Sequence, residues 1–388
     1  MTGEREIWQR QQYGTTWKGV GLYHITLVIP DRQSVLGRLV IPNNDPTLAK
    51  VEVLPLGHAL LDYQRTISDY HPEIQLLHYC LMPDHLHMIW YVRQTMPRGI
   101  ASAVRGFWQG VKKAGRAYSY LSLINSNDIR EKARKMEEST RMVFGRNEER
   151  ALGELVTDSL TKSQIQDISK MLQGQLGDEA YYQLAPIFTE MPHIQAMGHR
   201  SQLPTTIRYI DMNPQRLATK RIKPDYLRVQ RGIDIAGRLY DGVGNVAILQ
   251  ADRYAPVHVR RKMVEAAERG DDERLREYMN ACVLAARQGV VMVSPFISPK
   301  EKEVLSVLMR EKRKIIFLID KPMGEYYKPV DGLFDACAAG RILILSPATS
   351  DYKPEKDERP YGSHRITRNT CVALNKLAEE ICGGGRLE

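Results

Sequence analysis

Several common features are missing from this sequence of 388 residues, and each absence excludes a class of protein. No apolar stretch approaches the roughly 20 residues that a membrane-spanning helix needs, so we expect no membrane partner. The first residues, MTGEREIWQRQQYG, are polar and lack the apolar segment of a secretory signal. Neither a GxGxxG pattern nor a P-loop pattern occurs, so no dinucleotide or P-loop nucleotide site can be claimed.

Cysteine is scarce in this chain. Its residues are odd in number, scattered and without CxxC spacing: Cys80, Cys282, Cys337, Cys371 and Cys382. This pattern argues against a disulfide framework and against a thiolate zinc site. It favours a reducing compartment, and we expect a cytoplasmic protein.

Acidic residues are absent from one long stretch, although the formal net charge of +9 is moderate. Residues 93–118 hold six basic residues and no acid, with aromatic residues between them. Residues 214–231 hold six basic residues against one acid. Either stretch alone is more simply a solvated helix face, but the two together favour a nucleic acid partner. The candidate DNA contacts are Arg105, Trp108, Lys112, Lys113, Arg116 and Arg216.

The N-terminal part of the sequence predicts an α+β domain. Residues 21–30 read as a strand, 47–70 as a strand followed by a helix, and 74–92 as two strands joined by a turn at Met82-Pro83-Asp84. A helix over 99–118 follows. The order predicts a ferredoxin-like sheet with helices on one face, formed by residues 1–118 and 187–235. Residues 119–186 are charged and helix-prone, and we interpret them as a helical insertion.

The C-terminal part has a different pattern. Apolar runs at 245–250, 289–294, 314–319 and 341–346 alternate with helical segments, which is typical of a parallel sheet. We therefore predict a Rossmann-like α/β domain over 236–388. Ser298 and Glu301 form a predicted capping box, and Gly340 a predicted helix C-cap. The helix that begins at Ser298 is a candidate phosphate cradle, while a purely structural or partner-binding domain is an equally good interpretation.

Two histidines stand one residue apart at the start of the apolar run LMPDHLHMIWYV. In a strand, His85 and His87 project from the same face, so both imidazoles can bind one divalent metal. Leu86, Met88 and Trp90 then face the core. Alone, the HxH pattern more often marks a polar edge than a metal site.

A second cluster lies in RYIDMNP, where Tyr209 and Asn213 are one helical turn apart. A tyrosine becomes a nucleophile when a nearby positive charge stabilises its phenolate, and a metal held by the histidines would do so. Asn213 would add an oxygen ligand. The simpler alternative makes Tyr209 a half-buried helix residue and Asn213 the helix end before Pro214.

The segments YHIT, LMPDHLHMIW, GFWQGVKKAGRAY and IRYIDMNPQRL, taken in this order, resemble the HUH single-strand DNA transposases with one nucleophilic tyrosine. The likeness is greatest to the REP-associated tyrosine transposases and covers residues 15–118 and 190–230. It implies metal-dependent cleavage and strand transfer of single-stranded DNA through a 5′-phosphotyrosine intermediate. Tyr209 would be the nucleophile, and His85, His87 and Asn213 would hold Mg²⁺ or Mn²⁺. The implied partner is single-stranded DNA with a hairpin, and a homodimer stays open.

The chain also departs from that family. It is longer, the insertion separates the two halves of the site, and Asp211 replaces a neutral or aromatic residue. Because Asp211 lies two positions after Tyr209, we expect it to face away from the scissile phosphate. His24 is expected to lie near the site, whereas His193 and His199 are unplaced. Two other functions stay open: a domesticated protein that binds single-stranded DNA or hairpins without cutting, and a metal-dependent nucleotide hydrolase.

Overall fold

The computed structural model describes residues 17–125, 160–183, 188, 190–199, 201–347 and 367–383. The chain divides into two compact units. The first unit comprises Met1–Ile41 and Ala49–Pro214, and the second comprises Pro42–Leu48 and Gln215–Glu388. Both mix helices with sheets, in agreement with the mixed α and β class predicted. No helix among the described residues is long and apolar enough to cross a membrane.

The first unit is built on a four-stranded antiparallel sheet with the strand order β4-β5-β1-β6, and β2 and β3 form a separate ribbon. Its elements are β1 (Gly21–Val28), β2 (Gly37–Val40), β3 (Lys50–Val53), α2 (Pro55–Arg65), α3 (Ile67–Tyr70), β4 (Ile74–Met82), β5 (His85–Val92), α4 (Ile100–Asn125), α7 (Lys162–Gln183), β6 (His193–Ala196) and α8 (Gln202–Asp211). Short 3-10 turns lie at Pro30–Arg32, Pro42–Asn44 and Pro46–Leu48.

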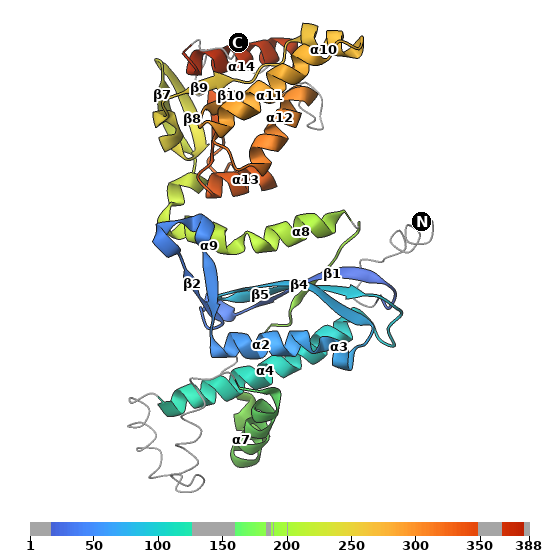
Figure 1. The fold of residues 1–388 in the computed structure, drawn as a ribbon. Helices are drawn as coiled ribbons and strands as arrows, with labels where there is room; N and C mark the ends of the chain where they lie inside the picture. The colour runs from blue at the N-terminus through green and yellow to red at the C-terminus, as the bar shows by residue number, and fades with distance from the viewer. Residues whose placement is uncertain are drawn as a thin grey trace. The chain divides into compact units, whose positions relative to one another are not determined.

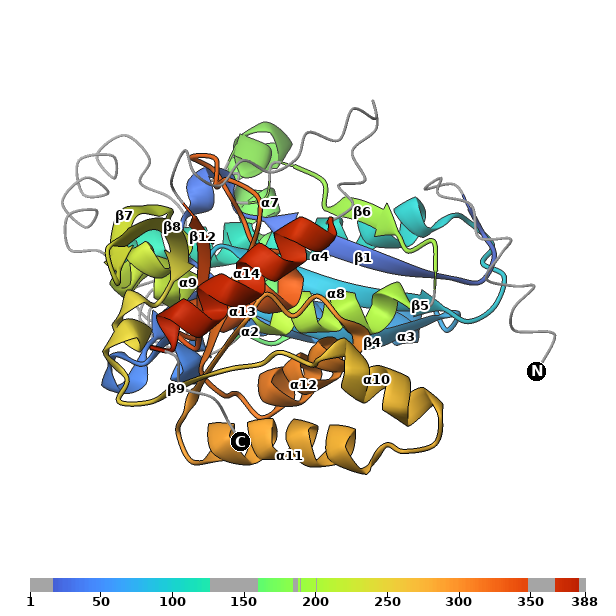
Figure 2. The same cartoon turned by 90° about the horizontal axis from the view of Figure 1, so that it is seen from above.

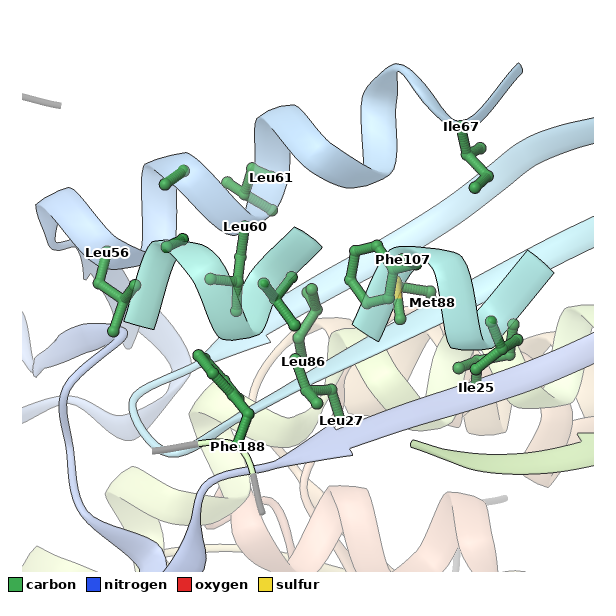
Figure 3. Close-up of a cluster of buried hydrophobic side chains, with 14 of the residues drawn as sticks. Ile25, Leu27, Leu56, Leu60, Leu61, Ile67, Leu86, Met88, Phe107 and Phe188 are labelled. Atoms are coloured by element: carbon green, nitrogen blue, oxygen red, sulfur yellow. The ribbon is translucent and has the colours of Figure 1, made fainter. Parts of the chain in front are cut away.

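Helices α2 and α4 cover one face of this sheet, and α8 covers the other (Figures 1 and 2). The main core fills the space between the sheet and α2 and α4, where Leu60, Leu86, Met88 and Phe107 meet (Figure 3). A smaller apolar cluster lies on the opposite face, where Ile210 of α8 packs with residues of the sheet. Side chains that alternate along each central strand therefore enter two different layers.

The turn predicted at Met82-Pro83-Asp84 is confirmed, because β4 ends at Met82 and β5 begins at His85. Its backbone is held from outside the hairpin. The Ile29 N–H donates to the Asp84 carbonyl at 2.9 Å, and the Leu36 N–H donates to the Pro83 carbonyl at 3.0 Å. The start of β5 is therefore a rigid position.

The second unit contains a six-stranded sheet with the order β7-β8-β12-β11-β10-β9. Strands β9 to β12 run parallel, and β8 pairs antiparallel with β12. The elements are α9 (Asn213–Ile222), which begins at the boundary, β7 (Gln230–Ile235), β8 (Arg238–Gly244), β9 (Tyr254–Pro256), α10 (Arg261–Glu268), α11 (Glu273–Arg287), β10 (Val291–Ser294), α12 (Pro299–Arg310), β11 (Ile315–Leu318), α13 (Asp331–Ala338), β12 (Ile342–Pro347) and α14 (Arg368–Ile381), with 3-10 turns at Pro224–Leu227 and Val246–Gln250.

Three of the four strands predicted for this unit are confirmed as β10, β11 and β12. The fourth prediction was wrong, because residues 246–250 form a 3-10 turn. The Asn245 side chain accepts a hydrogen bond from the Ala247 N–H and turns the chain there, while Ile248 is buried. The apolar residues of a short buried run have no periodicity that distinguishes a strand from a helical turn. The capping box of Ser298 and Glu301 and the left-handed Gly340, at φ 68°, are confirmed.

The observed boundary lies after Pro214, whereas the sequence placed it after residue 235. The physical reason is the hairpin of β7 and β8, which extends the sheet of the second unit. A boundary between 235 and 236 would cut that hairpin. Of the predicted insertion over 119–186, α7 and the end of α4 are described, and residues 126–159 and 184–186 lie outside the described residues.

Candidate functional site

The two histidines of β5 lie on the face of the sheet that α8 covers. Leu86, Met88 and Trp90 are fully buried on the opposite face, against α2 and α4. The alternation predicted for this strand therefore holds, and it turns His85 and His87 toward the same layer. Their ring centroids are 4.8 Å apart, in an edge-to-face arrangement.

His87 sits in the middle of a polar group on the central strands. Its Nδ1 lies 3.0 Å from His24 Nε2 and 3.1 Å from Thr26 Oγ1, both on β1. The side chain is 7% exposed. Burial, together with the neighbouring His85, His24 and Arg32, lowers the pKa of His87 to about 3. The imidazole is therefore neutral near pH 7, which is the form that binds metals.

His85 is fixed by the residue before it. Its Nδ1 lies 2.6 Å from Asp84 Oδ1, and Asp84 Oδ2 lies 3.5 Å from an Arg32 nitrogen. Burial alone would raise the pKa of the Asp84 carboxyl, but the hydrogen bond from His85 and the charges of His85 and Arg32 lower it below its ordinary value. Asp84 is thus a carboxylate that accepts the imidazole proton.

Tyr209 reaches this group from α8. The helix is amphipathic, and Ile210 and Ile207 pack it against Leu22 and Ile89 of the sheet. The Tyr209 ring centroid lies 6.2 Å from that of His87, and the side chain is 44% exposed. The phenol is therefore close to the histidines and accessible to a large substrate.

Asn213 does not share one continuous helix with Tyr209. Helix α8 ends at Asp211 and α9 begins at Asn213, so the helix is interrupted at Met212. Asn213 is half-buried, and its Nδ2 finds no hydrogen-bond partner among the described residues. A buried amide with an unused donor is costly unless a ligand or water meets it. An unused N–H donor fits a position beside a hydrogen-bond acceptor, such as a phosphate oxygen.

Asp211 is turned to the sheet and held there. Its Oδ1 lies 2.6 Å from Nε2 of His78 on β4. Burial first, and the Asp211 charge second, raise the pKa of the nearby Cys80 thiol to about 12. The acid that departs from the family pattern therefore has a partner in this chain, and the pair ties the C-terminal end of α8 to β4.

The predicted DNA contacts on α4 lie on the other side of the sheet. The buried face of α4 packs against the sheet and α2, on the side of the sheet opposite α8, which carries Tyr209 (Figure 1). Lys112 Nζ lies 3.6 Å from the centroid of the half-buried Trp108 ring, and Arg116 lies over two tyrosines of α7. Arg105 and Lys113 are exposed. These five residues form one surface, which we call the α4 stripe, and it is separate from the histidine group.

Arg216, the sixth predicted DNA contact, forms an ion pair within the second unit. Its Nε and Nη2 lie 2.8 and 2.6 Å from Asp335 Oδ1, and the two side chains are 12% and 3% exposed. Gln215 and Thr219 of the same helix bond to the carbonyls of Asp335 and Ala338. The guanidinium is engaged in anchoring α9 to α13, not presented to solvent.

The candidate phosphate cradle at Ser298 is filled by the chain itself. The Glu301 carboxylate accepts the N–H groups of Val259, Ile297 and Ser298, each at 3.0 Å. Glu301 is 2% exposed. The position that an anion would occupy at this helix start already holds a carboxylate.

Sequence reasoning missed three side chains of the site, Thr26, His78 and Asp84. The expectation that His24 lies near the site is confirmed. Asp84 offered a signal, since a carboxylate next to a histidine often orients it. His193 lies opposite Thr26 on β6, and it is the second cause, after burial, of the lowered pKa of His24. His199 is exposed in the turn before α8.

No group of three or more histidine, cysteine or acidic side chains in the described parts of the chain is arranged to hold a metal ion. The donors in the histidine group are the imidazoles of His85 and His87, and the Asn213 amide lies at the start of α9. In comparisons with known proteins, no family model, no curated protein and no solved structure matches this chain. The chemistry of the site must therefore be argued from its own residues.

Proposed function

We propose that this chain is a metal-dependent enzyme of the HUH tyrosine class, which cleaves and rejoins single-stranded DNA through a 5′-phosphotyrosine on Tyr209. One observation carries the proposal. The exposed phenol of Tyr209 stands beside His85 and His87, with its ring 6.2 Å from that of His87. A nucleophile, two imidazole ligands and an open approach for a phosphate are what this reaction requires.

The architecture of the first unit supports the same proposal. The chain order β1, α2, β4, β5, α4, β6 and the strand order β4-β5-β1-β6 fit a ferredoxin-like sheet with the HxH pattern on a central strand. The parallel strands β9 to β12, with helices on both faces, fit a Rossmann-like interpretation of the second unit. The five unpaired cysteines agree with a cytoplasmic location.

The residues present fit a divalent metal. Burial keeps the His87 imidazole neutral, and an amide such as that of Asn213 binds a metal through its oxygen. Imidazole donors suit transition metals better than magnesium, so of the two expected ions Mn²⁺ is favoured. Bound by His85, His87 and Asn213, the ion would polarise a phosphate oxygen and stabilise the phenolate.

The reaction itself is an exchange of phosphodiester bonds. The Tyr209 Oη forms a bond to phosphorus, the bond from phosphorus to the 3′ oxygen breaks, and the proton lost by the phenol is balanced by the one gained at the 3′ hydroxyl. One diester replaces another, so a free 3′ hydroxyl can reverse the step and join a new strand. Asn213 offers an amide donor one turn along the chain. The hydrogen bond with His78 on β4 holds the Asp211 carboxylate against the sheet.

The DNA contacts follow from the two faces of the sheet. The α4 stripe and the Tyr209 face are separated by the sheet and by a helix about 10 Å across, so one short DNA segment cannot touch both. We assign the α4 stripe to DNA that flanks the scissile phosphate, such as a hairpin. Arg216 is not part of the proposed interface, because its guanidinium is paired with Asp335.

The test is trapping of the covalent intermediate. The full chain is incubated with single-stranded oligonucleotides that carry hairpins and a label at the 3′ end, with Mn²⁺ or Mg²⁺, and run on a denaturing gel. Label at the size of the protein should form with wild type and with Tyr326→Phe, a control at another exposed tyrosine, and should be absent with Tyr209→Phe. Tight binding without covalent label would favour a domesticated binding protein, and metal-dependent release of nucleotide products would favour a hydrolase.

A further inference from the structure

Both histidines of the site have polar groups behind them, at the ring nitrogen Nδ1. A neutral imidazole carries one proton, and only the nitrogen without it can bind a metal. The group that meets Nδ1 therefore decides whether Nε2 is available. Metal-binding histidines in proteins commonly donate this second nitrogen to a carboxylate, a carbonyl or a water.

For His85 the assignment follows from the partner. The Asp84 carboxylate only accepts hydrogen bonds, so the 2.6 Å contact requires the proton on His85 Nδ1. The lone pair of the neutral ring is then on Nε2. The position of Asp84 is fixed, because its backbone carbonyl accepts a hydrogen bond from the Ile29 N–H and a nitrogen of Arg32 lies 3.5 Å from its second carboxylate oxygen.

For His87 two groups on the neighbouring strand serve the same purpose. Thr26 is the direct cross-strand partner of His87, and its hydroxyl lies 3.1 Å from Nδ1. His24, on the same face of β1, places Nε2 at 3.0 Å from the same atom. Each of the two can accept a proton from Nδ1, which leaves the lone pair of His87 on Nε2 as well.

We propose that Asp84, Thr26 and His24 are positioning residues that hold both imidazoles in the tautomer with Nε2 available to the metal. The inference rests on the metal site of the proposed function. It adds that the metal affinity is set partly by residues that do not touch the ion. Two strands and a hairpin turn supply them, so the arrangement exists before the metal arrives.

Mn²⁺ binding by the full chain tests this, measured by calorimetry and by the loss of the free Mn²⁺ signal in electron paramagnetic resonance. Asp84→Ala and Thr26→Val should each bind Mn²⁺ about 10- to 100-fold more weakly than wild type. Thr26→Ser keeps the hydroxyl and should restore affinity to within about twofold of wild type. Glu52→Gln, which alters an exposed carboxylate paired with Arg38, is the matched control.

A second measurement needs no metal and guards against variants that fold poorly. Long-range nitrogen correlation spectra of the protein labelled at histidine distinguish the two neutral tautomers. His85 and His87 should both carry the proton on Nδ1, and Asp84→Ala should shift His85 toward a mixture. A wild-type spectrum with the proton on Nε2 of His85 would overturn the inference.

The binding experiment also separates this inference from the proposed function. If His85→Ala abolishes Mn²⁺ binding while Asp84→Ala and Thr26→Val bind like wild type, the positioning role is refuted and the metal site stands. If wild type itself does not bind Mn²⁺ or Mg²⁺, the metal site fails and this inference fails with it.

Discussion

Acid should destabilise the first unit through His87, and the effect can be calculated. The neutral imidazole is buried under α8, so the pKa of His87 is about 3 in the folded chain against 6.5 for the exposed side chain. At pH values between these two, the unfolded chain therefore binds a proton at His87 that the folded chain does not bind. Stability from this group is fully present above pH 6.5 and is lost as the pH falls toward 3.

The magnitude follows from the difference between the two pKa values. Each unit of pKa corresponds to about 1.4 kcal/mol, so the free energy of unfolding should fall by about 2 kcal/mol between about pH 7.5 and about pH 5. The complete loss, reached below about pH 3, is about 4 to 5 kcal/mol. Burial and His193 lower the pKa of His24 too, which adds to the loss in the same direction.

The assay is urea unfolding followed by tryptophan fluorescence. The four tryptophans of the chain are Trp8, Trp17, Trp90 and Trp108, so the signal comes from the first unit alone. Wild type is compared with His87→Gln, which cannot titrate, and with His58→Gln, which replaces an exposed histidine of α2. The loss of stability on going from about pH 7.5 to about pH 5 should be about 2 kcal/mol smaller in His87→Gln than in either of the others.

The comparison concerns the pH dependence and not the absolute stability, which His87→Gln changes by removing a buried ring. Equal losses in wild type and His87→Gln would mean that His87 takes up its proton in the folded state. The imidazole would then not be buried as a neutral group, and the argument that it is ready to bind a metal would fail with it.

Two further predictions concern charges away from the histidines. Replacing both exposed residues of the α4 stripe, Arg105→Glu with Lys113→Glu, should weaken binding of single-stranded DNA. It should also reduce the slope of log binding constant against log salt concentration by about 0.7 for each phosphate that the protein no longer neutralises, whereas Lys170→Glu on α7 should change neither. An unchanged slope in titrations at several salt concentrations would mean that the α4 stripe is not part of the interface. Asp335→Ala removes the carboxylate that pairs with the buried Arg216 and should lower the free energy of unfolding of the second unit by about 3 to 5 kcal/mol. Glu265→Ala, which breaks an exposed pair with Arg261, should lower it by less than about 1 kcal/mol when both are measured by urea unfolding followed by circular dichroism.

The sequence was sufficient wherever the signal is local. The alternation along β5 placed His85 and His87 on one face and Trp90 in the core, because a strand has a period of two whatever it pairs with. The hairpin turn at Pro83 and the cap at Ser298 are local in the same sense. Each depends on residues within a few positions of one another.

The sequence was insufficient where the signal depends on pairing over a long distance. Thr26 contacts His87 because β1 and β5 pair in one register. The spacing of residues within either strand does not predict that register. His78 meets Asp211 across 133 positions for the same reason. The side of the sheet on which a helix packs is equally hard to predict: the helices were expected on one face, whereas α8 packs on the face opposite α2 and α4.

The tyrosine motif itself crosses from one unit to the other. Tyr209 and Asp211 belong to α8 and are tied to the first unit, whereas Arg216 of the same motif belongs to α9 and is anchored to α13 in the second. The helix is interrupted at Met212, between the two sets of contacts. The residues between Asp211 and Arg216 connect the two sets of contacts, so substitutions at Met212 or Pro214 should affect the position of Asn213 before they affect either core.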